Sequence, residues 1–173
     1  MKITQKALHR FLHEAIKGNR IISERPWSVE YTFSMKGSSA DDSEGSSADG
    51  FAVVMSSESG VTMRVIVDAY WNPQTGDQSG NSIKVEVDGK IVEGGTSYVP
   101  RRFDDGTKQR ILISNSPVAN VITVSHADAD PALPIVYLAV QNPFGTDDND
   151  IEWSVDTLGA GDVDVSMSKY INI

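Results

Sequence analysis

Hydrophobic and polar residues alternate along most of the chain after residue 26. In the first alternating stretch every second residue is apolar: Trp27, Val29, Tyr31, Phe33 and Met35. A period of two places these side chains on one face of a β-strand, so the pattern predicts a strand with one buried face. Similar patterns predict about ten strands in all, at 27–35, 51–56, 61–69, 83–88, 90–92, 109–114, 119–125, 134–141, 150–157 and 162–171.

The connections between these strands indicate the fold class. Asp88 and Gly89 separate two alternating stretches, and Asp-Gly is a strong hairpin signal because both turn positions need a positive φ. No helical period lies between the strands, which excludes a parallel sheet with crossover helices. We therefore expect a mainly β protein, built as an antiparallel, jelly-roll-like β-sandwich. A closed barrel is the alternative, since periodicity does not separate the two.

The first 25 residues follow a helical period instead. Their apolar residues fall on one stripe: Leu8, Phe11, Leu12, Ala15 and Ile16. Thr4 suits the N-cap of a helix, and Gly18 suits its C-terminal stop. The pattern predicts one short amphipathic α-helix that must dock on something to be stable, either on its own body or on a neighbouring subunit or another acidic partner. No continuous apolar stretch follows the positive charges, so this segment is not expected to be a secretory signal peptide.

Charge divides the chain at the same point. The chain of 173 residues carries 15 basic and 24 acidic residues. Residues 1–25 hold six of the basic and two of the acidic residues, a net charge of +4, which leaves -13 for the remainder. We therefore expect a basic helical arm (1–25) and an acidic β-sandwich body (26–173). The acidic body argues against a general nucleic-acid binder.

Composition excludes several classes of protein. The chain has no cysteine, which excludes a disulfide scaffold, a cysteine-ligated metal site and a thiol enzyme. No apolar stretch approaches the length of a membrane-spanning helix, so we expect no membrane contact.

No Gly-x-Ser-x-Gly elbow and no Walker loop is present. His9 and His13 have the spacing of a zinc-protease helix, but Arg10 stands where the catalytic Glu belongs. His126 follows a predicted strand and is expected in a loop.

These absences predict a protein that is not an enzyme and has no cofactor. Calcium is the one ion that its acidic loops suggest, with weak candidate ligands at Asp147, Asp148 and Asp150. The sequence departs from a calcium-binding hand loop, because Ile151 stands where a third oxygen ligand belongs. Polar turn residues are the simpler interpretation of this cluster.

Two short stretches have the composition of contact loops. Tyr70 and Trp71 end a predicted strand and enter a turn, where they can stack on a ligand. Arg101 and Arg102, followed by Phe103, combine residue types that are enriched at protein interfaces. Two further tryptophans, at 27 and 153, fall on apolar strand faces and are expected in the core.

The opening residues carry a family resemblance. Met1-Lys2-Ile3-Thr4, followed by Leu8, Leu12, Glu14 and Ile16, resembles a short helical leader found on many proteins of tailed bacteriophages, including virion proteins. Phe11 and His13 replace its lysine-rich pattern. The resemblance covers about 17 residues and implies a phage-encoded protein that is part of the particle.

Together these features predict a non-enzymatic structural virion protein, either a capsid decoration (cement) protein or a minor capsid component. It would be made in the host cytoplasm and bind protein, either itself or the major capsid protein, as a homo-oligomer or on a lattice. The expected partner-binding residues lie in the arm and in one loop: Lys2, Lys6, Leu8, Phe11, Leu12, Ile16, Arg101, Arg102 and Phe103. The alternative is a carbohydrate-binding or adhesion β-sandwich module that uses Tyr70 and Trp71.

Overall fold

The computed structural model describes seven stretches of the chain, which are residues 26–36, 50–69, 80–99, 102–128, 136–144, 151–158 and 162–172. They form ten strands: β1 (Trp27–Lys36), β2 (Gly50–Ser57), β3 (Thr62–Asp68), β4 (Ser82–Val87), β5 (Lys90–Tyr98), β6 (Gln109–Ser116), β7 (Val121–Asp128), β8 (Val136–Gln141), β9 (Ile151–Thr157) and β10 (Asp162–Asn172). The alternating stretches predicted from the sequence correspond to these strands one by one. The predicted N-terminal helix lies outside the described residues. Within the described stretches, no helix is long and apolar enough to span a membrane.

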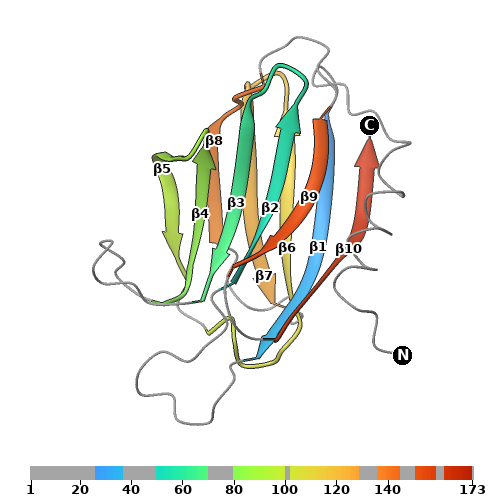
Figure 1. Cartoon of the computed structure of the whole chain (residues 1–173). Coiled ribbons are helices and arrows are strands. Elements are labelled where there is room, and N and C mark those ends of the chain that lie inside the picture. The colour runs from blue at the N-terminus through green and yellow to red at the C-terminus, as the bar shows by residue number, and fades with distance from the viewer. Residues whose placement is uncertain are drawn as a thin grey trace.

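The strands form two five-stranded sheets that face each other (Figure 1). Sheet A has the order β10-β1-β6-β7-β8, and sheet B has the order β5-β4-β3-β2-β9. Every pairing is antiparallel. The first strand pairs with the last and the second with the penultimate, so the chain wraps round in a jelly-roll-like manner. The predicted antiparallel sandwich is confirmed, and the described strands do not close into a barrel.

The core lies between the two sheets and follows the predicted alternation. In β1 the buried positions are those that the sequence pattern selects, from Trp27 to Met35. Trp27 and Trp153 meet in the core with their rings 5.1 Å apart, edge to face, and each is less than a twentieth exposed. The expectation that these two tryptophans are core residues is therefore confirmed. Apolar burial of this kind is the main force that holds two sheets together.

The Asp-Gly turn forms as predicted. Asp88 has a φ of 48° and Gly89 a φ of 79°, so both occupy the left-handed region that a tight hairpin between β4 and β5 requires. Asp88 is also bonded to the neighbouring strand, since Thr62 N–H donates to Asp88 Oδ1 at 2.9 Å. The strand after the turn is longer than predicted. It continues through Gly94 and Gly95 to Tyr98, because pairing with β4 is interrupted by a register shift after Ile91 and resumes at Thr96.

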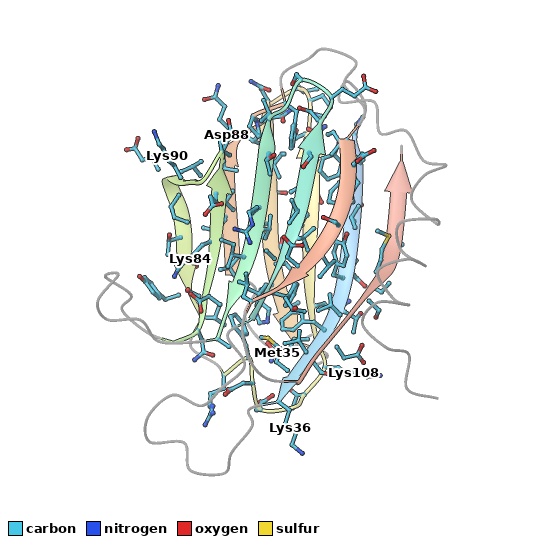
Figure 2. All side chains as sticks on the ribbon, in the orientation of Figure 1. Met35, Lys36, Lys84, Asp88, Lys90 and Lys108 are labelled. Atoms are coloured by element: carbon cyan, nitrogen blue, oxygen red, sulfur yellow. The ribbon has the colours of Figure 1, made fainter. Side chains whose placement is uncertain are left out.

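The antiparallel order sorts the connections onto two ends of the sandwich. The odd-numbered strands end, and the even-numbered strands begin, at one end, which we call the loop-bearing end. Met35 and Lys36 mark it in Figure 2, and Asp88 and Lys90 mark the opposite end. The connections at the loop-bearing end are 37–49, 69–81, 99–108, 129–135 and 158–161. Those at the opposite end between β2 and β3, β4 and β5, and β6 and β7 are short turns.

Candidate functional site

A row of polar side chains crosses the outer face of sheet B at its loop-bearing end. Met63, Val65 and Val67 of β3 point into the core, so the alternating Asp68 points away from it. Asp68 pairs with Ser82 of β4, and Ser82 pairs with Tyr98 of β5. Directly opposite residues share a face of the sheet, so these three side chains lie side by side. Lys84, two residues after Ser82, lies on the same face, and we call Asp68, Ser82 and Lys84 the polar row.

The row is held by an ion pair. Lys84 Nζ donates to Asp68 Oδ2 at 2.8 Å, and the two side chains are 16% and 13% exposed. Ser82 is 1% exposed, and its hydroxyl has no hydrogen-bond partner among the described residues. The exposed part of the group therefore offers an ammonium donor and a carboxylate acceptor, while the Ser82 hydroxyl is buried beside them. Because the two charges cancel, the row suits a neutral polar ligand better than an ion.

The connection from β5 to β6 crosses from sheet B to sheet A at this end. Hydrogen bonds from its backbone N–H groups hold it against both sheets. Asn81 accepts two of them: its backbone oxygen from Val99 N–H, and its side-chain Oδ1 from Phe103 N–H, both at 2.9 Å. On the other sheet, Gly106 N–H donates to Met35 O at 2.8 Å. The described residues of this connection are therefore held against both sheets.

This anchoring corrects the expectation for Phe103. The side chain is fully buried, with its ring 6.0 Å from that of Phe33 and 5.2 Å from that of His126. It is a core residue at the loop-bearing end and is not available to a partner. The sequence pattern misled us because Phe103 stands in an irregular stretch, where no period of two or 3.6 marks the buried positions.

Arg102 has the surface position that the sequence suggested, and its guanidinium is half exposed. Its Nε and Nη2 donate to the two carboxylate oxygens of Asp104, each at 2.9 Å. The Asp104 side chain is 3% exposed. A two-pronged bond of this kind fixes the guanidinium plane, so Arg102 presents a rigid cation at the loop-bearing end.

His126 is a second correction, because it lies in β7 and not in a loop. It is 3% exposed, and its Nε2 lies 2.7 Å from Oε1 of Gln109 on the adjacent strand β6. Gln109 in turn donates through Nε2 to Arg102 O at 3.1 Å. The pair forms a hydrogen-bond chain from β7 through β6 to the crossing connection at the loop-bearing end, and His126 packs against Phe103.

All the other predicted site residues lie outside the described stretches. Ala69 and Gly80, which flank the segment that contains Tyr70 and Trp71, are described and belong to the loop-bearing end. Residues outside the described stretches are Lys2, Lys6, Leu8, Phe11, Leu12, Ile16, Tyr70, Trp71, Arg101, Asp147, Asp148 and Asp150. Among the residues that are described, no group of three or more His, Asp or Glu side chains is placed to hold a metal ion.

Sequence reasoning missed the polar row because it is made by register and not by local pattern. Asp68, Ser82 and Lys84 each stand at a polar position of an alternating strand, which reads as an ordinary solvent-facing position. Only the antiparallel pairing of β3 with β4 brings them together. The one local signal is that the Tyr70-Trp71 dipeptide follows Asp68 within three residues.

Comparison with known proteins places this fold among plant lectins. No protein-family model and no curated protein matches the sequence. Among solved structures, peanut lectin, crystallised with a nine-residue peptide, aligns with a TM-score of 0.60 at 14% identity over 87% of this chain and 70% of its own. Winged bean acidic lectin, complexed with methyl-α-D-galactose, aligns at 0.59 and 14% over 83% and 65%. Lectin I from Ulex europaeus, complexed with a methyl glycoside of α-L-fucose, aligns at 0.58 and 11% over 89% and 72%. At such identities the likeness shows that the chain has the β-sandwich fold of these lectins.

Proposed function

We propose that the protein is a non-enzymatic carbohydrate-binding module whose site lies at the loop-bearing end of sheet B. The observation that carries this proposal is the polar row of Asp68, Ser82 and Lys84, from which the chain continues directly into Tyr70 and Trp71. The likeness of the sandwich to lectins that were crystallised with galactose and fucose glycosides supports it.

The chemistry of the row matches that of a neutral sugar. A sugar ring presents hydroxyl groups that donate and accept hydrogen bonds, and an apolar face of C–H groups. In this proposal Asp68 accepts from one hydroxyl and Lys84 donates to another. Ser82 lies between them but is 1% exposed, so it forms the floor of the row and does not contact the sugar. Trp71 stacks on the C–H face. A few convergent polar groups beside an aromatic platform are typical of a small-ligand site.

A glycan array probed with the full chain tests the proposal, followed by calorimetric titration of the best-bound sugar. We expect Trp71→Ala to weaken binding by up to roughly tenfold, because aromatic contacts contribute about 0.5–1.5 kcal/mol. Asp68→Asn should weaken binding by a similar factor through the loss of a charged acceptor. The matched control is Ile91→Ala, which removes a 47% exposed apolar side chain from sheet B near the opposite end. Unchanged affinity in both site variants, or no glycan bound at all, would refute the proposal.

A structural role in a phage particle is the second candidate. Two sequence features favour it, namely the helical leader that resembles those of phage proteins and the division between a basic arm and an acidic body. Light scattering of the full chain at low and high salt tests this candidate. An oligomer that dissociates at high salt would support it, because salt screens the attraction between arm and body. A monomer under both conditions, together with glycan binding, would favour the sugar-binding module.

A further inference from the structure

The two sides of the sandwich differ in how they are closed. On one side the edge strands β5 and β8 lie against each other. On the other side, β9 is the edge of sheet B and β10 is the edge of sheet A. Trp153 of β9 packs on Trp27 of β1 rather than on β10. The last strand of sheet A therefore extends past the edge of sheet B, as Figure 1 shows at the right of the view.

The inner face of β10 is apolar along this overhang. Val163, Val165 and Met167 pair with Met35, Phe33 and Tyr31 of β1, whose side chains are buried in the core. The β10 residues therefore point to the same side as the core. Val163 and Met167 are only partly buried, and so is Val155 at the edge of sheet B. We call this strip of Val155, Val163 and Met167 the open side of the sandwich.

We propose that residues 1–25 of the same chain dock on the open side and cover it. Their apolar stripe from Leu8 to Ile16 would span about 12 Å as a helix, and Val163 to Met167 of β10 span about 13 Å. The two apolar surfaces therefore match in length.

Charge is also complementary. Four acidic residues lie on the two edge strands, at Glu152, Asp156, Asp162 and Asp164, against one lysine at 169. Residues 1–25 carry a net charge of +4. Glu152, Asp156 and Asp164 are exposed and alternate with the inward-facing residues of their strands, so they lie on the outer faces of the two sheets. The attraction therefore acts between the whole basic arm and these acidic edge strands, and not through contacts on the strip itself.

The position at which β1 begins favours an arm from the same chain as the occupant of the open side. Trp27 pairs with Asn172 at the end of β10, so the described part of the chain begins on the strand that carries the strip. The stretch 17–25 can extend to about 30 Å, whereas Asn172 and Met167 are about 17 Å apart along the strand. A tether of this length gives an effective concentration in the millimolar range, which an arm from another molecule reaches only in an assembly. The docked arm would also shield the edge of β10 from pairing with another chain.

Site-specific photo-crosslinking tests this proposal. The full chain carries benzoyl-phenylalanine in place of Met167, or in place of Ile91 on β5 as the control for a distant edge strand. Equal amounts of ¹⁴N- and ¹⁵N-labelled protein are mixed before irradiation, and crosslinked peptides are identified by mass spectrometry. We expect position 167 to crosslink to residues 1–25 with both peptides carrying the same isotope, and position 91 to give no such product.

Two variants in the arm separate apolar docking from charge attraction. Leu12→Asp removes a stripe residue and should lower the crosslink yield by roughly tenfold. His13→Asp places the same new charge beside the stripe and should stay within about twofold of the parent. Crosslinks between ¹⁴N and ¹⁵N peptides would overturn the proposal by showing a second copy as the occupant, as expected of a lattice protein. Crosslinks that avoid residues 1–25, or equal yields from the two variants, would overturn it as well.

Discussion

Replacing Phe103 by alanine tests whether the crossing connection is part of the core or a contact surface. The side chain is fully buried against Phe33 and His126. Truncation of a buried phenylalanine costs about 3–5 kcal/mol, from the lost transfer of the ring and the cavity that remains. Since total stabilities lie at about 5–15 kcal/mol, we expect Phe103→Ala to lower the free energy of unfolding by roughly 4 kcal/mol. For a domain of this size, that is a fall of about 8–16 °C in Tm.

Equilibrium unfolding in urea, followed by tryptophan fluorescence, measures this change. The slope with urea should stay constant, because the variant exposes nearly the same surface on unfolding. Phe103→Leu retains most of the volume and should lose less than about 1.5 kcal/mol. Val118→Ala, at a fully exposed side chain in the β6–β7 turn, is the control and should stay within about 0.5 kcal/mol. A loss below about 1 kcal/mol for Phe103→Ala would refute the burial argument and restore Phe103 as a contact residue.

Three further predictions follow from backbone geometry, burial and charge. Gly50 has a φ of 117°, and a Cβ there would meet Val67 O at 1.9 Å. Gly50→Ala should therefore lower the free energy of unfolding by more than about 2 kcal/mol in the same urea assay. A smaller loss would show that β2 can shift. Burial raises the pKa of the Tyr31 hydroxyl above its ordinary value of 10.0, because the ionised form is poorly solvated in the core. The folded protein therefore keeps its full stability below pH 10 and loses stability as the pH rises above that value, where the unfolded chain can ionise. Tyr31→Phe should therefore lose less stability than the parent between pH 8 and pH 11, measured as the shift in the urea midpoint, and equal shifts would contradict this. Arg102→Ala leaves the buried Asp104 carboxylate without its two-pronged donor and should lower the free energy of unfolding by about 1–3 kcal/mol. Adding Asp104→Asn to this variant should restore part of that loss, because the neutral amide is easier to bury. No recovery in the double variant would contradict the charge argument.

The local pattern of the sequence determined the secondary structure. Alternation of apolar and polar residues marks the strands because a pleated strand turns successive side chains to opposite faces. This geometry is local, so it does not depend on which strands pair with one another. The same reasoning put Trp27 and Trp153 in the core and a positive φ at Asp88 and Gly89. Absence of a helical period then left only antiparallel arrangements, of which the sandwich is the one formed.

The tertiary structure decided which strands are neighbours and what their pairing brings together. Asp68 and Lys84 read as separate solvent-facing positions, and only the β3–β4 register makes them an ion pair. Phe103 stands where no local period marks burial, and it is a core residue because the connection from β5 to β6 crosses between the sheets. His126 continues the alternation of Ile122 and Val124 in β7, and the contact with Phe103 and Gln109 shows that this polar residue belongs to the core. Pairing of the first strand with the last, which leaves β10 as an overhanging edge, depends on contacts between residues far apart in the chain. Such contacts are selected by the packing of the whole sandwich, so no short stretch of sequence encodes them.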